Sequence, residues 1–217
     1  MTHYVTIASI RQVGTPIRSQ QRTSARARRS ANERAILDAA EALLADRSFH
    51  DLTVEDVMAA TGLTRTAFYR YFPDLQAVLL RRLEEISDEI RVAAGRWLEA
   101  DAAATGSLVE AARGLALVYQ RHGRVLLAFS DAAVTGRDVE KAWRAMVETF
   151  IHPVTAQIVD LRRRGLSSVE HPTETAKALV WMVERYLLES YGRGGGVDPD
   201  VAATVLADVF RRTLLSG

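Results

Sequence analysis

Apolar residues recur at helical spacing along most of the chain after Ser30, and no stretch alternates apolar and polar residues as a strand would. Residues 30–33 have the spacing of a capping box, which marks a helix start. The apolar residues of segment 36–44 then repeat every three or four positions, so we expect an amphipathic helix that ends near Arg47. This periodicity predicts an all-α fold.

Capping residues, glycine and proline divide the rest of the chain into further expected helices. Thr53 begins a short helix that Gly62 ends, because glycine adopts the left-handed backbone of a helix C-cap. Thr64 caps a second short helix, and Phe72 followed by proline ends it. Later helices are expected over residues 74–91, 107–121, 125–134, 138–164 with a bend at Pro153, 172–191, and from 198 onward.

The first 29 residues differ in charge from the rest of the chain. They contain six arginines and no acidic residue, whereas the whole chain has a formal net charge of +1, so the remaining residues carry a net −5. The segment is polar and lacks periodicity, which predicts a disordered basic arm over residues 1–29. Such an arm indicates contact with a polyanion, although a solvated tail explains the charge equally well.

The composition narrows the class of protein. The chain is 48% apolar and 25% charged, which is ordinary for a soluble globular protein. It has no cysteine, so disulfides, cysteine-ligated metals and thiol nucleophiles are excluded. No apolar run approaches the roughly 18 residues that a membrane-spanning helix needs. We therefore expect a soluble, cytoplasmic protein without a membrane partner, a metal or a cofactor.

The segment from Thr53 to Phe72 is the most informative part of the chain. Two short expected helices joined by Thr61-Gly62-Leu63 have the dimensions of a helix-turn-helix. In that motif the second helix enters the major groove of DNA, and its early residues meet base edges. A plain helical hairpin is the alternative, but two tyrosines and two arginines crowded into so short a segment favour DNA.

The residues of the second short helix divide between two faces. Phe68 is expected to point inward, whereas Arg65 and Thr66 are expected on the groove side. Arginine makes bidentate contacts with guanine, and a threonine methyl meets the thymine methyl. Tyr69 and Tyr71 place phenolic hydroxyls where phosphate oxygens run, and Arg70 adds a positive charge. The full set of candidate DNA-binding residues is Thr53, Thr64, Arg65, Thr66, Tyr69, Arg70 and Tyr71, with Arg26, Arg28 and Arg29 of the arm.

Four segments resemble the DNA-binding domain of TetR-type transcriptional repressors in composition, order and spacing. They are ILDAA (36–40), LTVEDV (52–57), TGLT (61–64) and FYRYF (68–72). The resemblance covers about residues 30–80 and extends weakly into residues 178–185. It implies a homodimer that binds a palindromic double-stranded DNA operator and is released by a small apolar effector.

The resemblance also implies a division into domains. A three-helix helix-turn-helix domain would occupy residues 30–80, and a C-terminal helical bundle over residues 88–217 would bind the ligand and dimerise. The fourth helix, about residues 74–91, would link them. Two positions depart from the family pattern, because Ala67 replaces a hydroxyl residue and Leu75 replaces a lysine. The basic arm is a candidate to supply the lost phosphate contacts.

Large apolar residues spread over separate expected helices are the candidates for the ligand pocket. For any one of them, ordinary core packing is the commoner role, but together they can line a cavity between helices. Glu184 beside Arg185 is the polar pair of interest, and it can orient a ligand, be structural or face a dimer seam. The candidate pocket residues are Leu115, Tyr119, Phe129, Trp143, Met146, Phe150, Val180, Trp181, Val183 and Glu184.

The last two expected helices are the candidates for the two-fold interface. A dimer places two recognition helices about 34–36 Å apart, so that they read successive major grooves. The candidate interface residues are Leu187, Leu188, Val205, Val209 and Phe210.

Other functions fit the sequence less well. The five histidines lack metal-ligand spacing, and no nucleophile motif frames a serine, so we expect no enzyme. Residues 192–196 are glycine-rich, but no strand precedes them and no Gly-Lys-Ser/Thr follows, so they are not a phosphate loop. The remaining alternatives are a helical scaffold or interaction protein of the same fold without specific DNA binding, an activator, and a sequence-independent DNA binder.

Overall fold

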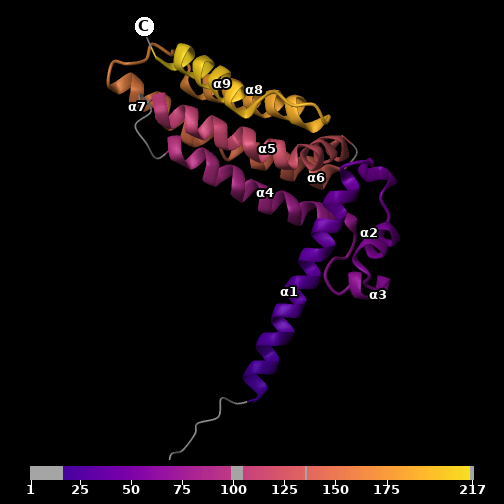
Figure 1. Cartoon of the computed structure of the whole chain (residues 1–217). Coiled ribbons are helices and arrows are strands. Elements are labelled where there is room, and N and C mark those ends of the chain that lie inside the picture. Colours follow the sequence, from indigo (N-terminus) through magenta and orange to yellow (C-terminus); the bar gives the residue numbers. More distant parts are fainter. Residues whose placement is uncertain (1–16, 99–104, 135, 216–217) are drawn as a thin grey trace, which may run out of the picture. The chain divides into compact units, whose positions relative to one another are not determined.

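The computed structural model describes residues 17–98, 105–134 and 136–215, and over these residues it is helical with no strand (Figure 1). This confirms the prediction of an all-α fold. The elements in chain order are α1 (Ile17–Leu44), a 3-10 turn η1 (Phe49–Asp51), α2 (Val54–Thr61), α3 (Arg65–Phe68), α4 (Leu75–Leu98), α5 (Thr105–Ala133), α6 (Arg137–Glu148), α7 (Ile151–Arg163), α8 (Pro172–Gly192) and α9 (Pro199–Leu214).

Helix α1 begins at Ile17 rather than near Ser30. The expectation of a disordered arm is therefore wrong from Ile17 onward, and residues 1–16 lie outside the described part of the chain. The physical reason is that Gln, Arg and Ala, which dominate residues 18–29, are all strong helix formers, so a helix needs no apolar periodicity there. Residues 1–35 and residues 36–217 form separate compact units.

Within the second unit, the end of α1 packs with α2, α3 and the start of α4 around a small apolar core. Ile36 from α1, Val57 from α2 and Phe68 from α3 are all fully buried. The phenyl ring of Phe68 also contacts that of Phe72, with centroids 6.0 Å apart. These aromatic contacts hold the two short helices in place although α3 is only four residues long.

Helix α5 is the centre of the C-terminal bundle and contacts α4, α6, α8 and α9 (Figure 1). It runs unbroken through Gly123, so the expected break between residues 121 and 125 is wrong. Gly123 serves close packing instead, because a Cβ there would lie 2.8 Å from the backbone of Tyr191 on α8. Helices α5 and α8 can approach at this point only because the side chain is absent.

The expected helix over residues 138–164 is two helices, α6 and α7, with the break before Ile151 instead of a bend at Pro153. The proline ring would clash with the carbonyl of Thr149 in a continuous helix, so α6 ends there. Pro153 then lies in the first turn of α7, where its missing N–H costs no helical hydrogen bond. No helix in the described ranges is long and apolar enough to cross a membrane.

Candidate functional site

Local hydrogen bonds determine the shape of the turn between α2 and α3. The Thr53 hydroxyl accepts a hydrogen bond from the Asp56 amide at 3.2 Å, and the Asp56 carboxylate accepts one from the Thr53 amide at 3.0 Å, which completes a capping box. Gly62 ends α2 in the left-handed conformation with φ of 68°. Thr64 then caps α3 by accepting from the Ala67 amide at 3.2 Å. The helix-turn-helix is therefore preformed by its own sequence.

Helix α3, its N-cap and the turn after it expose polar residues. Thr64, Arg65, Thr66, Tyr69 and Arg70 are all exposed. The rings of Phe68 and Phe72 are buried, as expected. The exposed residues therefore occupy the positions from which a recognition helix contacts a groove.

Arg65, the strongest candidate for base contact, is engaged with its neighbours in this structure. Its guanidinium pairs with the Glu55 carboxylate of α2 and lies 5.9 Å from the centre of the Tyr69 ring. The side chains of Arg65 and Glu55 remain 63% and 57% exposed. An ion pair so exposed is weak, so DNA phosphates and base edges compete for Arg65 at little cost.

Tyr71 and the two positions that depart from the family pattern have surroundings that bear on their roles. The ring of Tyr71 is half-buried and packs against the core, unlike that of Tyr69. Leu75 also packs against the core at the position where the family pattern has lysine, so its apolar side chain has a structural role. Ala67 is half-buried beneath the exposed face.

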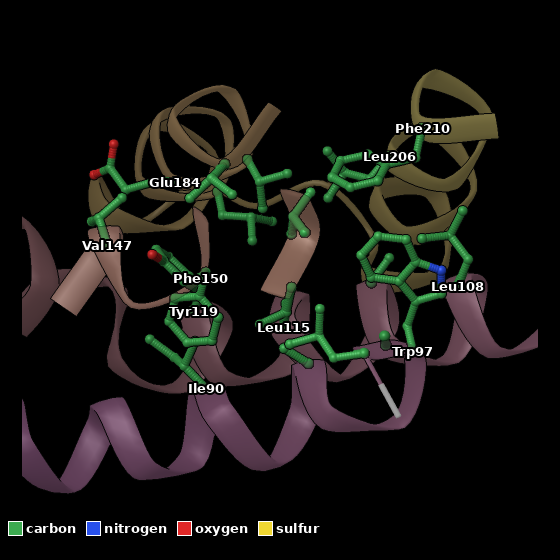
Figure 2. A pocket seen from close by; sticks show the side chains of 18 of the residues that line it. Ile90, Trp97, Leu108, Leu115, Tyr119, Val147, Phe150, Glu184, Leu206 and Phe210 are labelled. Atoms are coloured by element: carbon green, nitrogen blue, oxygen red, sulfur yellow. The ribbon is translucent and has the colours of Figure 1, made fainter. Parts of the chain in front are cut away.

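A cavity lies in the C-terminal bundle between α4, α5, α6, α7, α8 and α9. It encloses about 790 Å³ of space free of protein atoms, including its opening to solvent. Figure 2 shows side chains from these helices arranged around it, with the Glu184 carboxylate at the edge of the group and directed away from the others. Among the predicted pocket residues, those that line the cavity are Leu115, Tyr119, Met146, Phe150, Val180, Val183 and Glu184.

Three predicted pocket residues do not line this cavity. The rings of Phe129 and Trp143 stack on each other, with centroids 6.4 Å apart and planes at 19°, and both are buried in core between α5 and α6. Trp181 is half-buried, and the Arg144 guanidinium lies 6.0 Å from the centre of its ring. For these three residues the prediction of a pocket wall is wrong, because each finds a packing partner away from the cavity.

Sequence reasoning missed the wall that α4 contributes. Ile90, Ala94, Trp97 and Leu98 of this helix all line the cavity. The signal was present, since the apolar spacing of Ile86 and Ile90 continues to Trp97, but the helix was expected to end near Arg91. The cavity residues on other helices that were also missed are Leu108, Ala111, Ala112, Val147, Val154, Leu187, Leu206 and Phe210.

The predicted dimer residues divide into buried and accessible ones. Leu187 and Leu188 of α8 are 0% exposed, and Phe210 of α9 is 7% exposed. These three belong to the core of the single chain, which leaves them little surface for a partner subunit. Val205 is 45% exposed and Val209 is half-buried, and both remain accessible.

A group of hydrogen-bonded ionisable residues joins α1, α4 and α5. Glu41 of α1 lies 2.7 Å from Nδ1 of the buried His122 of α5 and pairs with the Arg82 guanidinium of α4. Arg82 also donates to Glu85 at 2.8 Å. We name Glu41, Arg82 and His122 the junction cluster. No group of three acidic or histidine side chains in the described residues is arranged to hold a metal ion.

Comparisons with known proteins agree on one family. Residues 36–81 match the model for bacterial regulatory proteins of the tetR family, and residues 108–216 match the model for the C-terminal domain of the transcriptional regulator EthR. The chain is 31% identical over 194 residues to the HTH-type transcriptional regulator EthR of Mycobacterium tuberculosis, covering 87% of this chain and 88% of the relative. It is 26% identical over 207 residues to EthR of Mycolicibacterium smegmatis, covering 90% and 94%.

Solved structures have the same fold at lower identity. The TetR-family regulator PfmR of Thermus thermophilus aligns with a TM-score of 0.69 at 15% identity, covering 83% of this chain and 99% of that one. AibR, solved with isovaleryl coenzyme A and operator DNA, aligns with a TM-score of 0.65 at 17% identity, covering 84% and 97%.

Proposed function

Because the chain belongs to the TetR family of bacterial transcriptional regulators, we propose that it is a homodimeric repressor that leaves its palindromic operator when a small lipophilic effector binds. The family consists of regulators and not enzymes, in agreement with the prediction that the chain has no catalytic activity. Operator DNA lies in the bacterial cytoplasm, and we propose that the protein acts there.

One helix supports the coupling between DNA and effector. Helix α4 begins at Leu75, directly after the helix-turn-helix, and its last turns carry Ile90, Ala94 and Trp97 in the cavity wall. A ligand that moves the C-terminal end of α4 therefore also acts on the start of this helix, which packs with α3. Ligand binding shifts DNA affinity only if the ligand prefers a conformation in which the two recognition helices are wrongly spaced.

The proposed DNA contacts follow from the exposed face of α3. Arg65 and Thr66 read base edges, while Tyr69, Arg70 and Tyr71 contact phosphates. Thr53 and Thr64 lie at helix starts, where backbone amides also favour phosphate oxygens. Arg26, Arg28 and Arg29 are exposed and add charge that attracts the DNA backbone.

The proposed dimer surface is the accessible face of α9. Val201 and Val205 are 50% and 45% exposed and lie one helical turn apart, and Val209 continues the same face. Exposed apolar residues in a row favour a second copy of the chain as the partner. Two-fold symmetry of the protein then matches a palindromic operator.

The walls of the cavity favour a lipophilic effector. Among the described residues that line it, only Trp97, Tyr119 and Glu184 have polar atoms in their side chains. AibR, which has the same fold, was solved with a ligand and operator DNA together. This supports the proposal that the present chain also binds both a ligand and an operator.

Binding of the purified protein to its own upstream DNA, against a scrambled sequence and across a salt series, tests the proposal. Arg65→Ala is expected to remove about 1–3 kcal/mol of specific binding, with a smaller effect on scrambled DNA. Deleting residues 1–29 is expected to weaken binding to both DNAs and to flatten the salt dependence. No preference for the natural sequence would instead favour a scaffold of the same fold.

A further inference from the structure

A second hollow in the described part of the chain is a polar cleft, which we name the junction cleft. Its walls come from the end of α1, from residues between 120 and 125 of α5, and from the glycine-rich connection 194–196 after α8. It encloses about 840 Å³ of space free of protein atoms, including its opening to solvent. No residue that lines it also lines the apolar cavity, so the two hollows are separate.

Arg124 is a cation in the wall of the junction cleft that no carboxylate neutralises. Its Nη1 donates to the Ala45 carbonyl directly after α1, and no acidic side chain of the described residues pairs with it. Arg121, which also lines the cleft, differs because its Nη1 lies 2.9 Å from the Glu89 carboxylate. A guanidinium has five N–H donors in a fixed fork. The exposed Arg124 side chain therefore keeps donors and a full charge for a ligand in the cleft.

The connection after α8 brings backbone N–H groups to the same guanidinium. A Cβ on Gly194 would lie 2.5 Å from Arg124 Nη2, so the backbone approaches this closely only because the side chain is absent. Arg193 has φ of −99° and ψ of 13°, and Gly194 has φ of 78°. A right-handed residue followed by a left-handed one turns successive N–H groups into a concave anion site. The N–H groups of residues 194–196 are exposed and have no acceptor within the described ranges.

The acidic residue in the wall of the cleft is already compensated. Glu41 belongs to the junction cluster, in which its carboxylate is 2.7 Å from Nδ1 of His122 and pairs with the Arg82 guanidinium. Its side chain is 20% exposed, whereas that of Arg124 is open to solvent. The groups left free in the cleft are therefore hydrogen-bond donors, from Arg124 and from the glycine backbone.

These donors suit a phosphate group better than a carboxylate or water. A phosphate monoester presents three strong acceptor oxygens, whereas a carboxylate presents two. Arginine binds phosphate through paired charge-assisted hydrogen bonds, and water cannot neutralise its charge. Residues 192–196 lack the Gly-Lys-Ser/Thr of a nucleotide phosphate loop, but an arginine from α5 supplies the cation instead.

We propose that the junction cleft is a second ligand site, which binds the phosphate group of a small phosphorylated molecule through Arg124 and the backbone of residues 194–196. This goes beyond the proposed function, whose effector site is the apolar cavity. Arg124 also holds the Ala45 carbonyl at the end of the helix that precedes the helix-turn-helix. A phosphate that engages Arg124 therefore acts on the DNA-binding part without entering the cavity, and it couples a polar ligand to DNA affinity.

Titration of phosphate into the full-length protein, followed by the phosphorus NMR line width at constant ionic strength, tests the inference. The probes are inorganic phosphate and glycerol phosphate, with acetate as a competing carboxylate. We expect saturable binding of both phosphates, and acetate should compete about tenfold less well. Arg124→Gln is expected to weaken phosphate binding by about tenfold, since it removes a charge-assisted paired contact. Arg124→Lys keeps the charge but loses the fork, so it should restore the affinity only in part.

Arg113→Gln is the matched control, because Arg113 lies on the same helix, is 53% exposed and pairs with Asp200 outside the cleft. It is expected to change phosphate affinity by less than about twofold. Gly194→Ala is a second test that leaves Arg124 in place. Its methyl group would meet the guanidinium, and its positive φ is unfavourable for alanine, so phosphate binding should fall here too. Urea unfolding of each variant shows whether it is folded under the conditions of the titration.

The outcomes separate this inference from the proposed function. No saturable phosphate binding, or binding that Arg124→Gln and Gly194→Ala leave unchanged, overturns the inference while operator binding and release by a lipophilic effector can still hold. Equal competition by acetate overturns the choice of phosphate. At constant ionic strength, phosphate should change the affinity for upstream DNA in the wild type and not in Arg124→Gln, and equal effects in both overturn the coupling. Phosphate binding without any DNA binding supports the site and contradicts the repressor.

Discussion

Glu41 and Glu184 are carboxylates removed from solvent in two regions of the molecule, and their surroundings are opposite. Glu41, in the junction cluster, is largely buried, which alone would raise its pKa. The hydrogen bond to His122 and the charge of Arg82 outweigh that effect, so its pKa is lowered. Glu184, in the cavity wall, has no hydrogen bond, and burial raises its pKa.

The difference separates a carboxylate that forms contacts between helices from one that has no hydrogen bond within the described residues. Glu41, Arg82 and His122 come from α1, α4 and α5, so their contacts hold the end of α1 against the helices that lead to the cavity. Glu184 makes no hydrogen bond to another helix within the described residues. The comparison predicts that removing the first carboxylate weakens the fold and that neutralising the second strengthens it.

The largest effect is expected from Glu41→Ala. It removes the less exposed of the two α1 carboxylates that pair with the Arg82 guanidinium, whose side chain is only 14% exposed. Breaking a buried pair typically costs about 3–5 kcal/mol, and we expect about 3 kcal/mol in the free energy of unfolding by urea at neutral pH. The folded-state pKa of Glu41 is lowered, so its contribution is present above the unfolded-state pKa and is lost as pH falls through the folded-state value. The penalty must therefore shrink in acid.

Asp38→Ala is the matched control for that change. Asp38 lies 3.9 Å from the same guanidinium, but its side chain is 57% exposed. Its removal is expected to change stability by less than about 0.5 kcal/mol. Equal penalties for the two variants would contradict a structural role that is specific to Glu41.

A smaller effect of opposite sign is expected from Glu184→Gln in the absence of ligand. Because the folded-state pKa of Glu184 is raised, its contribution to stability is present below the unfolded-state pKa and is lost as pH rises through the folded-state value. Glutamine does not ionise, so the variant avoids this loss and should be more stable at pH 8 by on the order of 1 kcal/mol. Urea unfolding across a pH series checks this, and a variant less stable than wild type at pH 8 would show that Glu184 is a structural residue.

A small effect on stability is also expected from Glu55→Gln. This change breaks the exposed pair with Arg65, and exposed pairs contribute about 0–1 kcal/mol. Thermal unfolding should therefore change little, whereas DNA affinity should rise a few-fold because Arg65 no longer has to leave a carboxylate. Lower DNA affinity in the variant would indicate that Glu55 positions Arg65 for base contact.

Local chemistry made the helix-turn-helix predictable from the sequence. Thr53, Gly62 and Thr64 form hydrogen bonds or backbone conformations that depend only on residues within a few positions. Apolar spacing likewise identified the helices and the all-α class. The same kind of information placed Phe68 inward and Arg65 outward.

Several of the errors concern features that depend on distant parts of the chain. Gly123 looked like a helix break, but it accommodates the backbone of Tyr191, which is remote in sequence. Phe129 and Trp143 looked like pocket residues and instead stack on each other. Leu187 and Leu188 looked like interface residues because periodicity shows that a face is apolar but not which neighbour covers it. The cavity wall on α4 was missed because this helix was expected to end near Arg91, whereas it continues to Leu98.

A nuclease footprint of the purified protein on its own upstream DNA tests the central claim most directly. The account predicts one protected segment with two half-sites related by a dyad and with their centres one helical turn, or a multiple of it, apart. Arg65→Ala should abolish the protection at the same protein concentration. Uniform protection without a dyad, or a footprint that Arg65→Ala leaves unchanged, would contradict a dimeric repressor that reads its operator through α3.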